Sequence, residues 1–131
     1  MPAMTNAFPA GAKVGTFLAT RDRARAKAFF ADTLGFHAVH EDDYAVVYDL
    51  NGTHLRISAV KEFTPQPFTV LGWGVPDIAA TVRALKAKGV AFNIYDDMGQ
   101  DELGIWTVPG GTIQVAWFHD PDKNVLSLTQ F

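Results

Sequence analysis

The feature that most constrains the fold is a helix-forming pattern that occurs twice, about half the chain apart. In each copy an Asp precedes a segment of helical periodicity and a Gly follows it: Asp22 and Gly35 first, then Asp77 and Gly89. Asp caps the first N–H groups of a helix, and Gly adopts the positive φ with which many helices end. Strand-like segments flank each helix. We therefore expect an α+β fold of two βαβββ modules, with the helices on one side of a mixed sheet and a concave trough on the other.

The two modules are expected at residues 13–60 and 68–131, after a flexible lead-in at residues 1–12. A Pro-rich linker at residues 61–67 should join them. In the first module, Asn51-Gly52 separates two alternating segments and is the strongest short signal for a hairpin. The expected helices cover residues 22–34 and 77–88, and the expected strands cover residues 13–19, 36–40, 44–50, 53–60, 68–75 and 90–95, followed by three short strands within 104–131.

The composition excludes several classes of protein. The chain of 131 residues has no cysteine, so disulfides, thiol nucleophiles and zinc ribbons are excluded. Its net charge of −3 argues against a nucleic-acid partner, and no apolar run is long enough to span a membrane. The first residues lack the basic and apolar segments of a signal peptide. We expect a cytoplasmic protein with neither nucleic acid nor membrane as a partner.

Three stretches resemble the vicinal oxygen chelate superfamily, which contains glyoxalase I, bleomycin-resistance proteins, extradiol dioxygenases and fosfomycin-resistance enzymes. Leu18-Ala-Thr-Arg-Asp22 with the later Leu34-Gly-Phe36 is similar to its strand–helix entry, and Val75-Pro-Asp77 is similar to the counterpart in the second half. Asp120-Pro-Asp-Lys-Asn124 resembles its closing turn, with Lys in place of the usual Gly. The resemblance implies a glyoxalase/bleomycin-resistance/dioxygenase-type fold, and a homodimer whose subunits complete each other's troughs.

The resemblance also locates the positions at which metal-using members carry ligands. Here they fall near Gly15 and Val70 and at Ser127, or at Thr16 and Thr69 if the register differs by one residue. None of these side chains is a carboxylate or an imidazole, the ligands that divalent ions commonly take from proteins. We therefore expect no metal cofactor, and we count Ser127 among the ligand-contacting residues instead.

The histidines offer one alternative metal site. His37 and His40 precede the run Glu41-Asp42-Asp43, so His40 and Asp43 could together hold an ion. A solvated acidic loop is the favoured interpretation, because charged clusters usually lie at the surface. His119, beside the closing turn, is expected at the rim of the trough.

Strand alternation supplies the candidate binding residues. In the 53–60 strand, Leu55 and Ile57 should face the helices, whereas His54 and Arg56 should face the trough or solvent. Within the trough, Arg56 would bind a carboxylate or phosphate, although an exposed surface Arg is an equally good interpretation. Opposite it we expect apolar walls and one amide, while two other tryptophans, Trp73 and Trp117, are expected in the core. The wall and amide residues are Tyr48, Trp106, Gln114 and Phe118.

Three functions are compatible with these patterns. The first is metal-free binding of a small aromatic or hydrophobic molecule, with an anionic group if Arg56 takes part. The alternative is a metal-dependent lyase, isomerase or dioxygenase that acts on substrates with vicinal oxygens. The third is an interaction module whose trough is filled by its own side chains. No Ser-His-Asp arrangement or nucleophile elbow occurs, so no catalytic residue is assigned.

Overall fold

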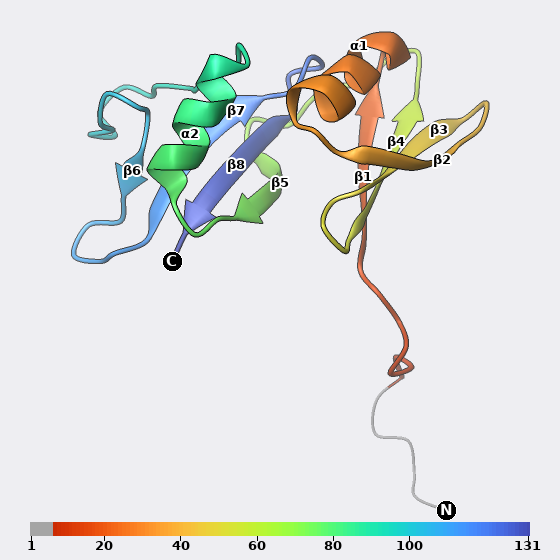
Figure 1. Ribbon diagram of the computed structural model, residues 1–131, viewed down its shortest axis with the longest axis horizontal. Helices are drawn as coiled ribbons and strands as arrows, with labels where there is room; N and C mark the ends of the chain where they lie inside the picture. The colour runs from red at the N-terminus through yellow and green to blue at the C-terminus, as the bar shows by residue number, and fades with distance from the viewer. Residues whose placement is uncertain (1–6) are drawn as a thin grey trace, which may run out of the picture.

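The strands form two four-stranded sheets with the same internal order, as the computed structural model shows for residues 7–131 (Figure 1). The first sheet runs in the order β1 (Gly15–Thr20), β4 (His54–Ala59), β3 (Ala45–Asp49) and β2 (His37–Glu41). The second runs in the order β5 (Thr69–Gly74), β8 (Val125–Gln130), β7 (Gln114–His119) and β6 (Trp106–Thr107). In each sheet the first pair is parallel and the other pairs are antiparallel. The predicted α+β fold of two repeated modules is confirmed.

Both predicted helices are present, and both begin as expected. Asp22 accepts a hydrogen bond from the backbone N–H of Arg25 at the start of α1 (Arg23–Lys27), and Asp77 does the same for Ala80 at the start of α2 (Ile78–Ala87). The first helix continues beyond α1 as a π-helical segment, η1 (Ala28–Thr33). Gly35 and Gly89 follow the helix ends with φ values of 83° and 94°, a region that costs glycine no side-chain clash.

The predicted hairpin turn is also present. Asn51 and Gly52 both have positive φ, 59° and 109°, and they connect the antiparallel strands β3 and β4. The Gly52 N–H donates to the Asp49 carboxylate at 2.8 Å, which closes the turn. The predicted lead-in at residues 1–12 falls partly outside the described residues, and residues 7–12 are exposed.

The strand predicted at residues 90–95 is wrong. This segment makes only an isolated bridge between Phe92 and Phe118, and the loop that follows is organised by one side chain. The amide of Gln100 donates to the carbonyl oxygens of Asn93 and Gly104, both at 2.8 Å, and accepts from the Tyr95 N–H at 2.7 Å. The Asn93 N–H donates to the Trp117 carbonyl of β7 at 2.7 Å, but Gln100 takes the next two backbone groups, so the pairing with β7 does not extend into a strand.

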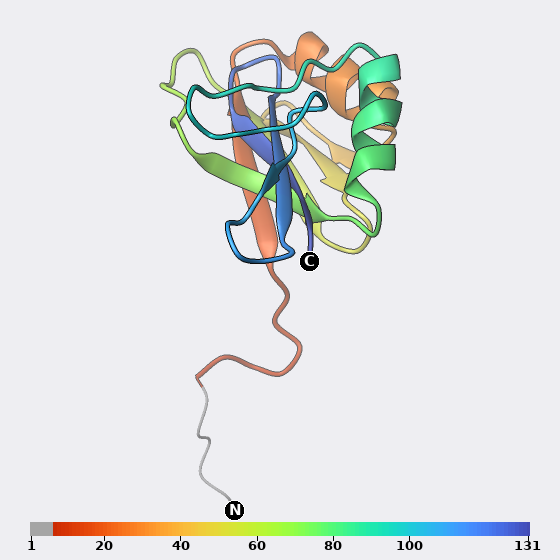
Figure 2. The same cartoon turned by 90° about the vertical axis from the view of Figure 1, so that its left-hand side faces the viewer.

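One hydrophobic core spans both modules, and η1 connects them. Phe30 packs against Tyr48 on β3, with ring centroids 5.9 Å apart, while its neighbour Phe29 packs against Phe118 on β7 at 6.4 Å. The helices therefore lie on one side of the strands, which Figure 2 shows in side view. Within residues 7–131, no helix has the length and apolar character needed to cross a membrane.

Candidate ligand-binding faces

Each sheet has an inner face, which packs against the helices, and an outer face, which points away from them. In β4 the inner residues Leu55 and Ile57 are 0% and 3% exposed, whereas the alternate residue Arg56 is half-buried. The same alternation in β7 places Ala116 and Phe118 inside and Trp117 outside. Because no helix covers the outer faces, they are where a ligand or another chain can bind.

On the outer face of the first sheet, Arg56 lies beside Phe17. These two residues are paired neighbours on β4 and β1, and Val47 on β3 flanks Arg56 from the other side. Phe17 is 71% exposed, an unusual position for a large apolar side chain. Among residues 7–131, Arg56 makes no ion pair, so its guanidinium is available to an anion. His54, two residues before Arg56 on β4, shares this face and is exposed.

An aromatic cluster occupies the outer face of the second sheet. The Trp117 ring lies 6.0 Å from the Trp106 ring and 5.7 Å from the Tyr95 ring, which it meets edge to face. Trp106 and Trp117 are half-buried, and Tyr95 is 41% exposed. Trp106, predicted as a wall of the trough, lies on this outer face, whereas the core position predicted for Trp117 is wrong. Trp73 does pack in the core, stacked on Phe36 at 5.7 Å.

Small residues lie next to this cluster. Ser127 on β8 is the paired neighbour of Trp117 on one side and of Gly72 on the other. A Cβ atom on Gly72 would lie 2.5 Å from the Ser127 hydroxyl oxygen, so only glycine fits there without displacement. The outer face of the second sheet thus combines an aromatic wall with a floor of Gly72 and Ser127. A planar molecule can approach the backbone closely at such a floor.

Three of the predicted trough residues lie on the inner faces instead. Tyr48 and Phe118 are 1% and 0% exposed and contact Phe30 and Phe29 of η1, so their predicted position in the trough is wrong. Gln114 shares the inner side of β7 with Phe118, and its amide donates to the Thr107 hydroxyl at 3.5 Å. For Phe118 and Gln114 the error comes from the strand predicted at 112–119, in which neither side is fully polar. Trp117 was assigned to the core for the same reason, whereas Tyr95 was placed in the strand predicted at residues 90–95.

The metal-ligand positions implied by the resemblance carry no imidazole or carboxylate. Within residues 7–131, no group of three or more His, Cys, Asp or Glu side chains is placed to share an ion. The His40 ring lies 3.1 Å from the Asp42 carboxylate. The Tyr44 N–H, then the His40 ring and the Ala45 N–H, hold the pKa of the Asp42 carboxyl at about 2. Asp42 therefore closes the turn after β2.

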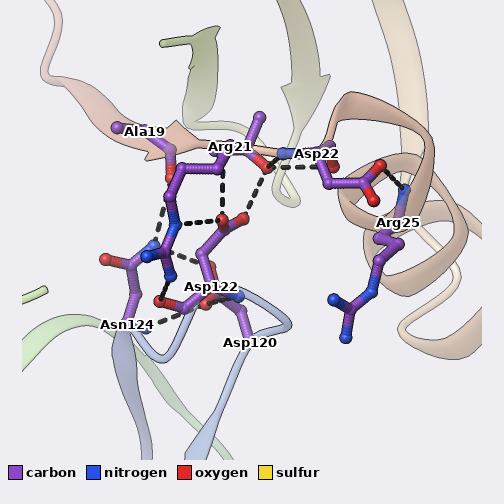
Figure 3. A network of polar contacts seen from close by, with 8 residues as sticks. Ala19, Arg21, Asp22, Arg25, Asp120, Asp122 and Asn124 are labelled. Atoms are coloured by element: carbon purple, nitrogen blue, oxygen red, sulfur yellow. Dashed lines mark hydrogen bonds and ion pairs between the residues drawn. The ribbon is translucent and has the colours of Figure 1, made fainter. Parts of the chain in front are cut away.

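The closing turn fastens the second module to the first (Figure 3). The buried Asp122 carboxylate accepts from the Arg21 N–H at 2.8 Å and from the Thr20 hydroxyl, and the Asn124 amide donates to the Ala19 carbonyl at 3.3 Å. Asp120 accepts from both Asn124 and the Asp122 N–H, and its burial raises the pKa of its carboxyl. The turn therefore fixes the position of β8, which carries Ser127, relative to the first module.

A hollow of about 280 Å³ lies on the inner side, between the modules. Trp73, Phe36 and Phe118 line it together with Leu85 of α2. The Trp73 indole N–H is buried and has no hydrogen-bond partner within the described part of the chain. Neither Trp106, Trp117 nor Tyr95 lines this hollow, so it is not part of the proposed outer-face site.

Comparison with known proteins identifies the same fold. The family model described as "Glyoxalase/Bleomycin resistance protein/Dioxygenase superfamily" matches residues 13–128. The antibiotic-binding protein TnmS3 from Streptomyces sp. CB03234 is 24% identical with a TM-score of 0.69, over 94% of this chain and 98% of that one. A protein of the same superfamily from Alicyclobacillus acidocaldarius is 17% identical with a TM-score of 0.69, over 98% and 95% of the two chains. A third, from Nocardioides, is 13% identical with a TM-score of 0.71, over 97% and 86%. No curated protein matches the chain.

Proposed function

The chain belongs to the glyoxalase/bleomycin resistance protein/dioxygenase superfamily, and on that basis we propose that it binds a planar aromatic small molecule on the outer face of its second sheet. The observation that carries this proposal is the cluster of Trp106, Trp117 and Tyr95 beside the floor of Gly72 and Ser127. Indole and phenol rings that are only half-buried offer stacking surface to a ligand. Each aromatic pair contributes about 0.5–1.5 kcal/mol beyond the area that it buries. The antibiotic-binding activity named for TnmS3 is of this general kind.

We propose that Arg56 binds the anionic group of the ligand, and that a second copy of the chain brings Arg56 to the aromatic cluster. Arg56 lies on the first sheet and the aromatic cluster on the second, so the two parts belong to different modules. Both outer faces expose large apolar side chains, among them Phe17 at 71% and Tyr95 at 41%. Exposed apolar surface of this kind is typical of protein–protein interfaces. A homodimer that pairs the outer face of one module with that of the other module would cover this surface and enclose the ligand.

Ligand binding is tested by tryptophan fluorescence with a planar aromatic acid such as naphthoate. Trp106→Ala should weaken binding at least tenfold, because it removes one wall of the site. Arg56→Ala should lower the affinity for the acid by about tenfold or more, since a charge-assisted hydrogen bond contributes about 1.5–3 kcal/mol. It should leave the affinity for the uncharged parent ring unchanged. Arg83→Ala, which removes an exposed cation of α2, is the matched control. Equal affinities for all three variants and the wild type would refute the proposed site.

The homodimer is tested by light scattering on a size-exclusion column. Phe17→Glu places a charge on the outer face of the first sheet. It should shift the protein to monomers and weaken binding of the aromatic ligand. Tyr44→Glu changes an equally exposed aromatic, 74% against 71%, in the turn between β2 and β3, and should do neither. A wild-type chain that elutes as a monomer at high concentration would contradict the dimer.

The enzymatic alternative is a metal-dependent lyase, isomerase or dioxygenase, and it is tested separately. Protein purified without chelators should be analysed for bound metal and then melted with nickel, zinc, manganese or iron(II) added. Under our proposal no ion raises the melting temperature by more than about a degree. Stoichiometric metal, or a rise of several degrees with one ion, would support the enzymatic function instead, because a ligand that binds only the native state raises its stability.

A further inference from the structure

A cleft of about 430 Å³ is lined by positively charged residues. Arg25 comes from α1, Lys88 from the end of α2, and Lys123 and His119 from the closing turn and the end of β7. Three separate segments of the fold thus line one hollow. Neither Arg56 nor any residue of the aromatic cluster lines it.

The charge in this cleft is not neutralised by the described part of the protein. Between residues 7 and 131, none of Arg25, Lys88 and Lys123 takes part in an ion pair, although the whole chain carries a net charge of −3. The carboxylate that lines the cleft, Asp120, is 5% exposed and accepts hydrogen bonds within the closing turn from Asp122 and Asn124. Asp120 therefore hydrogen-bonds within the closing turn and forms no ion pair with the three cations, which remain available to a ligand.

Lys123 occupies a backbone position that favours glycine. Its φ is 72°, in the left-handed region where a side chain is strained and glycine is not. Strained residues of this kind concentrate at binding sites, where the side chain has a use that offsets the strain. His119 gives a second indication of where the charge acts: burial, followed by the charge of Lys123, lowers the pKa of the His119 imidazole. The positive charge of Lys123 is therefore felt inside the cleft.

We propose that this cleft binds the phosphate group of a small organic phosphate ester. A phosphate monoester carries nearly two negative charges and three terminal oxygens, which matches three cations that approach from different elements. The hollow is much larger than a phosphate group, and Phe29 and Val90 line it with apolar surface that suits the organic part. The site is independent of the aromatic-ligand site proposed above, and the two ligands should bind together without competing.

The test is calorimetric titration with phenyl phosphate, with inorganic phosphate in a parallel titration. Lys123→Gly should lower the affinity for phenyl phosphate by tenfold or more. The variant should melt no lower than the wild type, because glycine suits the backbone at this position. Retained folding with lost binding separates the role of the side chain from a loss of structure. Arg25→Gln should weaken binding to a similar extent.

Lys86→Gln is the matched control, because Lys86 is an exposed cation two residues from Lys88 that does not line the cleft. It should leave the affinity for phenyl phosphate unchanged. The proposal is overturned if phenyl phosphate does not bind at millimolar concentration, or if Lys86→Gln weakens it as much as Lys123→Gly does. Equal affinity for inorganic phosphate and phenyl phosphate would overturn the assignment of an organic ligand.

Discussion

Removing the Asp122 carboxylate should loosen the attachment of the second module to the first. The side chain is 6% exposed and accepts from the Thr20 hydroxyl and the Arg21 N–H, residues at the end of β1 more than a hundred positions away in sequence. Hydrogen bonds to a charged group contribute about 1.5–3 kcal/mol each. Asp122→Ala removes these two bonds and the longer ion pair with the Arg21 Nε at 3.5 Å. Water reaches part of the vacated site beside the half-exposed Arg21, so we expect a loss of about 3 kcal/mol.

For a chain of 131 residues this loss corresponds to a fall in melting temperature of roughly 10 °C. The measurement is urea denaturation followed by circular dichroism, with a thermal melt alongside. Asp122→Asn keeps one acceptor oxygen and should fall between Asp122→Ala and the wild type. Asp96→Ala, which removes an exposed carboxylate from a loop, should change stability by less than about 0.5 kcal/mol. A loss below about 1 kcal/mol for Asp122→Ala would refute the reasoning that this turn fastens the modules.

Three further changes test separate features. Gly72→Ala should cost about 1–3 kcal/mol because the new methyl group meets the Ser127 hydroxyl at 2.5 Å, and Ser127→Ala in the same chain should restore most of it in a double-mutant cycle. Lys123→Gly should raise stability by about 1 kcal/mol by relieving the left-handed backbone, as measured by urea denaturation. Burial lowers the pKa of His119 below its usual 6.5, so the unfolded chain takes up this proton first and stability falls as the pH drops below that value. His119→Gln should therefore lose less melting temperature than the wild type between pH 7.5 and 5.5, and an identical loss would contradict the assignment.

The sequence was sufficient for those parts of the fold that local chemistry decides. Asp22 and Asp77 cap their helices, and Asn51-Gly52 turns with positive φ, because each of these effects acts within a few residues. The strand at residues 90–95 was mispredicted because the Asn93 carbonyl and the Tyr95 N–H bind the side chain of Gln100, whose role depends on how the later loop folds back. Nothing in the apolar pattern of residues 90–95 indicates that partner.

The candidate site was only partly predictable, for a related reason. Alternation identified the two faces of β4 correctly, since Leu55 and Ile57 are apolar and Arg56 is not. In β7 both faces are apolar, and the choice between Phe118 and Trp117 depends on which face η1 covers. Contact with Phe29, a residue of the first module, decides which face of β7 is buried. The sequence of the strand alone does not contain this information.

The adjacent residues Phe29 and Phe30 contact different sheets, one on each side of the boundary between the modules. Because these two adjacent side chains pack against both halves, the stability of each half depends on the other. The repeat in the sequence therefore does not correspond to two independent folding units, and we expect the chain to unfold in one cooperative transition. A chain cut within residues 61–67 should stay assembled, held by the aromatic packing of η1 and by Asp122, whereas either half alone would leave Phe29 or its partner Phe118 without cover.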